Sequence, residues 1–138
     1  MKLTKDYMLS KNFSTAEIKC KCGCNTIVID ESTDVLLQKL RDKLGKSIIV
    51  SSGYRCPAKN KACGGAKRSQ HMLGKARDIK VSGLTPLEVA YAAIEIGFKG
   101  VGVYTHNDNY FTHVDTRKTK TYWIDQKDTH DIIIVKKL

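Results

Sequence analysis

The sequence predicts an α+β fold, in which helices pack on one side of a small antiparallel sheet. Two segments, 30–45 and 85–97, carry apolar residues at helical spacing between capping residues. After residue 97 the apolar residues alternate instead, in short segments separated by polar turns. Because neighbouring short strands joined by tight turns pair as hairpins, we expect the sheet to be antiparallel.

The first helices are expected before residue 46. Ser14 followed by Glu17 is a capping-box pattern, which predicts a short helix from residue 15. A longer amphipathic helix is expected between Asp30, a suitable N-cap, and Gly45, a suitable stop. Its apolar stripe consists of Leu36, Leu37, Leu40 and Leu44.

Short strands and helices alternate in the middle of the chain. The apolar segments "SIIVSS" and "DIKVS" predict buried strands, and "CPAKNKACGG" predicts one or two helical turns. The clearest helix is "TPLEVAYAAIEIG", with Thr85 as its N-cap and Gly97 just past its end. Its inward residues are expected to be Leu87, Ala90, Ala93 and Ile94. The last strands are expected in "GVGVYT", "YFTHVDTR", "TYWID" and "DIIIVKKL".

Length and charge restrict the class of protein. A chain of 138 residues suits one hydrophobic core, so residues 1–138 are expected to form a single domain. No apolar run is long enough for a transmembrane helix, and the opening segment does not resemble a signal peptide. The net charge of +10 favours polyanionic partners such as nucleic acid, anionic lipid or a bacterial cell wall. Because the lysines are spread along the chain without an arginine-rich block, a nucleic-acid partner is not expected.

Three of the five cysteines, Cys20, Cys22 and Cys24, lie within "CKCGC", and Cys56 and Cys63 flank "PAKNKA". The first three could bind a structural zinc, with Cys56 or Cys63 as the fourth ligand. Their one-residue gaps are tighter than is usual for zinc sites. Free, reduced thiols are the alternative interpretation.

Two histidines and a carboxylate suit a catalytic zinc, which needs about three protein ligands. His71 precedes a glycine-containing turn, and Asp78 opens a predicted strand, so a loop between them could bring both together. His113 lies in a strand where alternation puts Asp115 on its face. A histidine on a half-buried strand is also a common core or surface residue, so spacing alone leaves both interpretations open. The basic residues between His71 and Asp78 are expected to be exposed.

Two stretches, "SSGYRCPAKNKACGGAKRSQHMLGKARDIKVSG" and "YFTHVDTR", resemble the zinc D-alanyl-D-alanine carboxypeptidase family of cell-wall peptidases. This group includes vancomycin-resistance dipeptidases and phage L-alanyl-D-glutamate endolysins, and the hedgehog signalling domain shares its fold. The resemblance extends over residues 12–123, and its separated motifs occur in the family's order. It implies a hedgehog/DD-peptidase-like fold and a zinc ion bound by His71, Asp78 and His113.

The resemblance also implies roles for two neighbouring residues. Arg55 matches an arginine that polarises the scissile carbonyl or binds a substrate carboxylate, and a structural salt bridge is the alternative. Ser69 would contact substrate or orient a ligand, and a turn-capping hydroxyl is the alternative.

The general base is where the sequence departs from the family. Family members place an acid three residues before the last ligand or a histidine two before it, and here those positions are Tyr110 and Phe111. Asp115 is the first substitute, because it shares a strand face with His113, although such a carboxylate could instead orient the ligand. Asp108 and His106 are weaker candidates.

The resemblance therefore predicts a zinc-dependent peptidase that hydrolyses a bond of the peptidoglycan stem peptide. A D-Ala-D-Ala carboxypeptidase is expected first, with an L-Ala-D-Glu endopeptidase or a non-catalytic, hedgehog-like zinc-binding module as alternatives. A zinc-stabilised nucleic-acid binder built on "CKCGC" would leave the histidine motifs unexplained. We expect a monomer, encoded by a bacterium or phage, made in the cytoplasm and acting on the cell wall.

Overall fold

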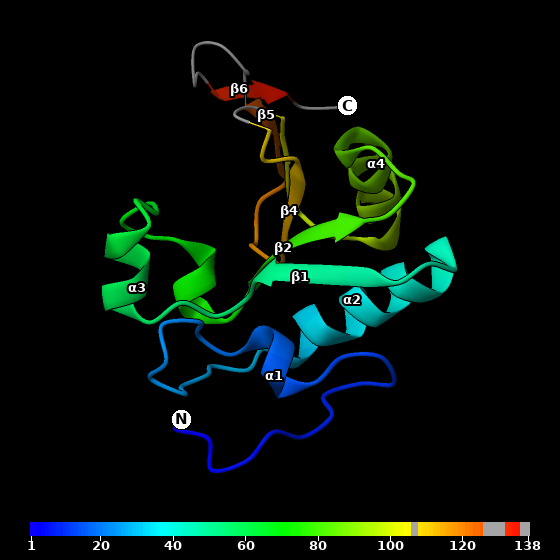
Figure 1. Cartoon of the computed structure of the whole chain (residues 1–138). Coiled ribbons are helices and arrows are strands. Elements are labelled where there is room, and N and C mark those ends of the chain that lie inside the picture. Colours follow the sequence, from blue (N-terminus) through cyan, green and yellow to red (C-terminus); the bar gives the residue numbers. More distant parts are fainter. Residues whose placement is uncertain (106–107, 126–131, 136–138) are drawn as a thin grey trace.

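The computed structural model describes residues 1–105, 108–125 and 132–135, and within them an α+β fold is built around one mixed sheet (Figure 1). The described strands follow the order β1-β2-β4-β3-β5-β6 across the sheet. Their bounds are Ile48–Ser52 for β1, Ala76–Val81 for β2, Gly100–Tyr104 for β3, Phe111–Asp115 for β4, Thr121–Asp125 for β5 and Ile132–Val135 for β6. The fold class predicted from the sequence is confirmed.

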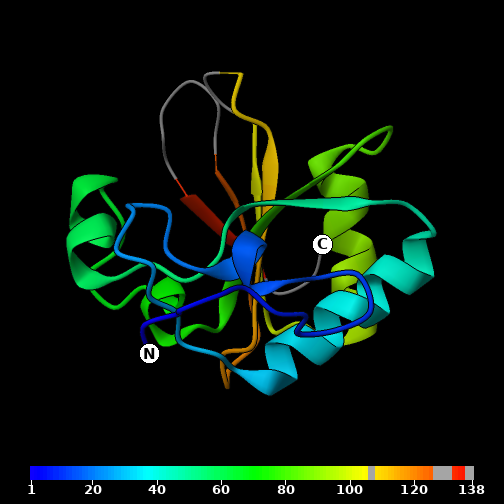
Figure 2. The same cartoon turned by 60° about the horizontal axis from the view of Figure 1, so that its bottom comes forward.

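The helices lie on both sides of this sheet. Their bounds are Thr15–Ile18 for α1, Glu31–Leu44 for α2, Pro57–Ala62 for α3, Pro86–Ile96 for α4 and Gln70–Leu73 for the 3₁₀ helix η1. The α4 helix packs on β2, β3 and β4, and α2 packs against α4. Figures 1 and 2 show α3 on the opposite side of the strands from α2 and α4. The expectation of helices on one side therefore holds for α2 and α4, whereas α3 and its neighbour η1 depart from it.

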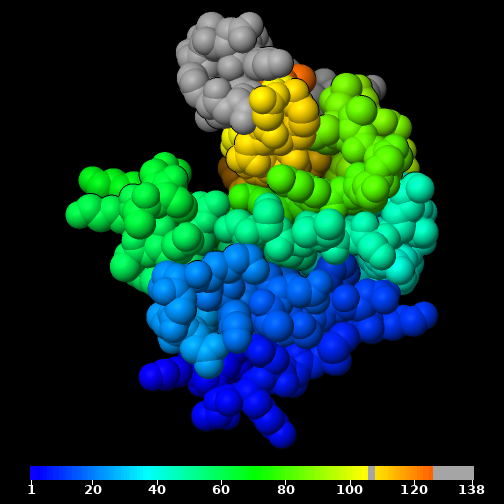
Figure 3. All heavy atoms as spheres, viewed as in Figure 1, coloured from blue at the N-terminus to red at the C-terminus, as the bar shows by residue number. Residues whose placement is uncertain are grey.

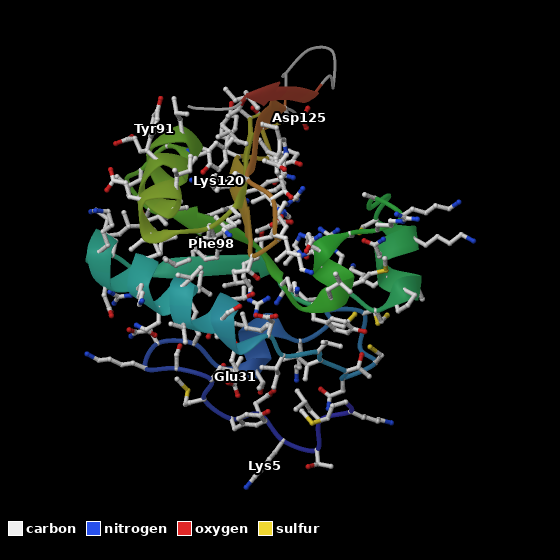
Figure 4. All side chains as sticks on the ribbon, turned by 180° about the vertical axis from the view of Figure 1, so that it is seen from behind. Lys5, Glu31, Tyr91, Phe98, Lys120 and Asp125 are labelled. Carbon is white, nitrogen blue, oxygen red and sulfur yellow. The ribbon has the colours of Figure 1, made fainter. Side chains whose placement is uncertain are left out.

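The helix ends agree with the capping residues in the sequence. The Asp30 carboxylate accepts from the Thr33 N–H at 3.1 Å, and α2 ends at Gly45 with a left-handed φ of 61°. The inward face of α4 differs at one position, since Leu87 is exposed and Val89 is buried. Figure 4 shows Tyr91 on the outer side of α4 and Phe98 next to the sheet.

One strand pair differs from the predicted antiparallel sheet. Strand β5 pairs with β3 in parallel, whereas the other described pairs are antiparallel. The chain leaves β4, passes the end of β3 and continues on the far side of β3. Lys99 guides this crossover, because its N–H donates to the Asp115 carbonyl at 3.2 Å and its carbonyl accepts from the Thr121 N–H at 2.7 Å. Short polar turns therefore do not always join neighbouring strands.

The two faces of the sheet have different chemistry. The face beneath α4 is apolar and forms the core; it includes Ile79, Val101, Val103, Val114 and Tyr122. Because side chains alternate along each strand, the opposite face carries polar and aromatic residues at the intervening positions. These residues are Asp78, Tyr104, Phe111, His113, Asp115 and Trp123. The site described below is built on this second face.

Arg77 corrects the expectation that the basic residues before Asp78 are exposed. It is completely buried and pairs with Asp34 of α2 at 2.8 Å. Its guanidinium also donates to the carbonyl of Gly74 at 3.0 Å. Its place in β2 explains the burial, since alternation directs Arg77 to the face opposite Asp78.

The amino-terminal segment packs beside β1 and α3, where Figure 3 shows it in blue. The Tyr54 N–H donates to the Ile18 carbonyl at 2.7 Å. Gly53 lies so close to Ile18 that a Cβ at this position would collide with the Ile18 backbone. The chain after β1 is therefore fixed against α1. No described helix is long and apolar enough to cross a membrane.

Candidate metal centre

Three side chains from separate elements converge on the polar face of the sheet. His71 comes from η1, Asp78 from β2 and His113 from β4. One potential ligand atom from each lies within 4.8 Å of the others. His71 Nε2 lies 3.2 Å, and His113 Nδ1 3.0 Å, from Asp78 Oδ1. The residues that the sequence suggested as zinc ligands are therefore placed together by the fold.

The local structure explains how these residues meet. Asp78 stands directly opposite His113 in the β2–β4 register, and it is the third residue of β2 rather than its first. His71 is presented by η1, which the sequence did not predict. The Ser69 hydroxyl accepts from the His71 N–H at 3.2 Å, and Gly74 ends the turn with a φ of 71°. Ser69 thus has the turn-capping contact that was the alternative for it, and it also lines the cleft.

Each histidine is oriented by a second partner on its other nitrogen. His71 Nδ1 lies 2.7 Å from the Gly53 carbonyl, which can only accept, so Nδ1 carries a proton. This leaves Nε2, 3.2 Å from Asp78 Oδ1, as the nitrogen available for a metal. His113 Nε2 donates to Asp115 at 2.7 Å, so Nδ1 is the nitrogen available for a metal. Two imidazole lone pairs and one carboxylate form a donor set that fits zinc and leaves a fourth position open.

Charges within the site shift the pKa of Asp78 and of His113. Burial disfavours the charged form of Asp78, but its contacts with His113 and His71 outweigh burial and hold its pKa well below the usual range. Burial also disfavours protonated His113, but the carboxylates of Asp115 and Asp78 raise its pKa to about 9. At neutral pH a proton on His113 therefore occupies the place that a cation would take.

The contacts of Asp115 bear on the two roles considered for it, a general base and a carboxylate that orients His113. It is completely buried, and its carboxylate accepts from Arg117 Nη2 at 2.6 Å and Nε at 2.9 Å in addition to His113. Burial would raise its pKa, but Arg117 and His113 hold the pKa well below the usual range. A Cβ at Gly100 would collide with this carboxylate, so Asp115 lies flat against β3. The geometry fits the alternative role, a carboxylate that orients His113.

The other expected bases lie elsewhere. Asp108 is exposed in the turn before β4, with a left-handed φ of 55°, and does not line the cleft. His106 lies outside the described residues.

Arg55 forms the salt bridge that was the alternative for it, and it also lies at the cleft. Its Nη2 donates to Asp78 Oδ2 at 3.2 Å, and its Nε donates to the Ser52 hydroxyl at 3.0 Å. It also lines the cleft above the three converging side chains. The salt bridge therefore orients Asp78 while the remaining guanidinium N–H groups stay near the cleft.

The cleft has a volume of about 570 Å³ and a basic lining. Arg68 and Arg117 line it together with Arg55, and Asp78 is the one carboxylate among its described lining residues. Arg68 is exposed, and no carboxylate in the described part of the chain lies within ion-pair distance of it. The lining suits an anionic substrate, and sequence reasoning missed both Arg68 and Arg117.

An aromatic wall closes the cleft beside His113. Tyr104 stacks on Phe111 with ring centroids 4.5 Å apart, and the Trp123 ring lies 5.2 Å from that of His113. Trp123 Nε1 donates to the Tyr104 hydroxyl at 2.9 Å. A Cβ at Gly102 would collide with Trp123, so the glycine makes room for the wall. The alternating glycines of "GVGVY" were the sequence signal that could have indicated this packing.

Comparisons with known proteins agree with the geometry. A family model described as peptidase M15 matches residues 11–115. The chain is 30% identical over 139 residues to the probable peptidoglycan L,D-endopeptidase MepK of Haemophilus influenzae, covering 88% of this chain and 72% of that protein. It is 39% identical over 82 residues to the zinc D-Ala-D-Ala carboxypeptidase of Streptomyces albus G, covering 56% of this chain and 31% of that protein. It is 33% identical over 87 residues to the peptidoglycan L,D-endopeptidase MepK of Escherichia coli K12, covering 58% of this chain and 47% of that protein. The match thus spans about a third and about half of the last two proteins.

Proposed function

Because this chain belongs to the peptidase M15 family, we propose that it is a zinc metallopeptidase that hydrolyses a bond of the peptidoglycan stem peptide. The observation that carries the proposal is the convergence of His71, Asp78 and His113 beside an arginine-lined cleft. The site itself supplies the chemistry that a metallopeptidase needs.

Zinc would be held by His71 Nε2, the Asp78 carboxylate and His113 Nδ1. When bound there, zinc lowers the pKa of a coordinated water and polarises the scissile carbonyl. The Gly53 carbonyl and the Asp115 carboxylate hold the two imidazoles in the ligating orientation. Asp115 therefore acts through His113 rather than on the substrate.

Tyr104 is suited to stabilise negative charge that develops on the substrate. Its oxygen accepts from Trp123, so its own proton is free to donate toward the cleft that it lines. Burial raises the pKa of Tyr104, which keeps the hydroxyl protonated at neutral pH. Together with Arg55 it supplies donors of the kind that stabilise an oxyanion.

The arginines favour a substrate that ends in a carboxylate. Arg68 is exposed at the cleft without a carboxylate partner among the described residues, so it can bind a chain-terminal carboxylate. This supports D-Ala-D-Ala carboxypeptidase activity as the first candidate. The match to an L,D-endopeptidase over 88% of the chain supports the second, cleavage of an internal bond such as that between L-Ala and D-Glu.

Digestion of purified peptidoglycan, with mass spectrometry of the released fragments, tests the proposal. Release of free D-alanine identifies a carboxypeptidase, and a new amino terminus on a D-residue identifies an endopeptidase. Arg68→Gln should raise KM for a carboxypeptidase substrate with little change in kcat, because it contacts only the carboxylate. If zinc-loaded protein releases no fragment, the chain is instead a non-catalytic zinc-binding module.

We also propose how the chain is organised and where it acts. Residues 1–138 act as one metallopeptidase domain and as a monomer, an assignment supported by a single chain supplying the three ligands and the cleft. The protein is encoded by a bacterium or phage, is made in the cytoplasm and acts on the cell wall. The net charge of +10 supports attraction to that anionic polymer.

A further inference from the structure

A second group of potential metal ligands lies in the amino-terminal half. One sulfur from each of Cys20, Cys22, Cys24 and Cys56 lies within 4.8 Å of the others. The first three belong to the turn after α1, and Cys56 is the N-cap of α3. Cys63 is not part of this group; it is exposed, and its thiol donates to the Asn60 carbonyl at 3.5 Å. Of the two fourth ligands that the sequence left open, the fold brings Cys56 to the cluster.

The backbone explains why one-residue gaps suffice here. In an extended strand, alternate side chains point the same way but stand too far apart to share one ion. Here residues 21–24 form a turn, and Gly23 and Asn25 have left-handed φ values of 93° and 58°. The chain curls around the cluster, so that all three thiols of "CKCGC" face its centre.

The sulfur spacing matches a tetrahedral metal site. Zn–S bonds of about 2.3 Å place the sulfurs of a tetrahedral site about 3.8 Å apart. The Cys22 sulfur lies 3.5 Å from that of Cys20 and 3.7 Å from that of Cys56. A disulfide would need about 2.05 Å and would join only two of the four thiols. Two sulfur pairs at this spacing, with all four sulfurs within 4.8 Å of one another, fit one shared ion better than two disulfide bonds.

Backbone N–H groups support negative charge on these sulfurs. The Cys56 N–H donates to the Cys20 sulfur at 3.4 Å, and the Lys59 N–H donates to the Cys56 sulfur at 3.4 Å. Such outer partners orient metal ligands and stabilise thiolates. We propose that Cys20, Cys22, Cys24 and Cys56 bind a structural zinc ion, in a site separate from the His71, Asp78 and His113 centre.

The cysteine site is connected to the histidine centre through one chain segment, and its expected effect on that centre rests on the proposed function. The segment 53–56 connects the two centres: the Gly53 carbonyl accepts from His71, Arg55 donates to Asp78, and Cys56 joins the cysteine cluster. Zinc on the cysteines would fix one end of this segment. Loss of the cysteine-bound zinc should therefore weaken zinc binding at the histidine centre. The effect should be smaller than that of removing His71, Asp78 or His113 directly.

Zinc analysis of purified protein tests the proposal. Wild-type protein should carry two zinc ions per chain, and Cys22→Ser and Cys56→Ser should each carry no more than one. Cys63→Ser is the matched control and should keep two, because Cys63 lies outside the cluster. Replacing zinc by cobalt(II) should give a thiolate charge-transfer band in the wild type that Cys22→Ser loses and Asp78→Asn retains.

The cobalt spectrum of the wild type keeps the test decisive if the cysteine variants do not fold. A wild-type protein without a thiolate band, with iron in place of zinc, or with a disulfide among these four cysteines would overturn the assignment. So would Cys22→Ser and Cys56→Ser proteins that retain two zinc ions. Failure of the proposed function is distinguishable, since the thiolate band would persist in protein that releases no peptidoglycan fragment.

Discussion

Replacing Asp115 with asparagine removes a negative charge from a completely buried position and keeps the size of the side chain. In the native protein its Oδ2 accepts from His113 Nε2 at 2.7 Å and from Arg117 Nη2 at 2.6 Å, and its Oδ1 accepts from Arg117 Nε at 2.9 Å. The amide of asparagine has one acceptor oxygen, so at least one of these three hydrogen bonds is lost. Because a hydrogen bond between charged groups contributes about 1.5–3 kcal/mol, we expect the free energy of unfolding to fall by about 2 kcal/mol.

The effect on the metal separates the two roles considered for Asp115. Loss of a partner that orients a ligating histidine typically weakens metal affinity or activity about 10–100-fold. Loss of a general base lowers turnover about 10²–10⁴-fold and leaves the metal in place. For Asp115→Asn we therefore expect zinc affinity at the histidine centre to fall about 10–100-fold, with most of the turnover recovered at saturating zinc.

Competition with a chromophoric chelator measures the affinity, and peptide hydrolysis at saturating zinc measures the turnover. Asp108→Asn is the matched control, because this exposed carboxylate does not line the cleft, and both quantities should remain unchanged. Wild-type zinc affinity in Asp115→Asn, together with a loss of turnover above 100-fold at saturating zinc, would refute the orienting role and restore Asp115 as the base.

Three further changes test other parts of the site. Tyr104→Phe removes one hydroxyl that lines the cleft, so kcat should fall about 10-fold or more at unchanged zinc content, and an unchanged kcat would remove Tyr104 from oxyanion stabilisation. Gly102→Ala places a Cβ against Trp123 and should lower the free energy of unfolding by about 1–3 kcal/mol in a denaturant titration; an unaltered midpoint would contradict this packing. Because the pKa of His113 is raised to about 9 in the metal-free protein, zinc must displace a proton below that pH. Apparent affinity at the histidine centre should thus rise with pH up to about 9, and a pH-independent affinity below this value would count against the coupling.

The sequence predicted those features that depend on local chemistry. Asp30 and Gly45 delimit α2 because capping and left-handed φ are properties of a few neighbouring residues. The convergence of His71 and Asp78 was suggested by spacing and strengthened by the family resemblance. Alternation also placed Asp115 on the same face as His113, which the β2–β4 and β3–β4 registers confirm.

The burial of individual side chains and the pairing of the strands could not be inferred from the sequence in the same way. Alternation assigns Asp115 to a face, but Gly100 on the neighbouring strand lets its carboxylate lie against the sheet beneath His113. The parallel pairing of β5 with β3 depends on which strand edge remains free after β4 has paired. Arg77 appeared to be an exposed basic residue because its partner, Asp34, is 43 positions away in sequence. These features depend on contacts between distant segments, for which periodicity gives no signal.

An anomalous difference map across the zinc absorption edge, from crystals of the zinc-loaded protein, tests the central claim most directly. We expect one peak within bonding distance of His71 Nε2, the Asp78 carboxylate and His113 Nδ1, at about 2.0–2.2 Å from each. A map in which zinc occupies other positions while these three side chains hold none would contradict the account.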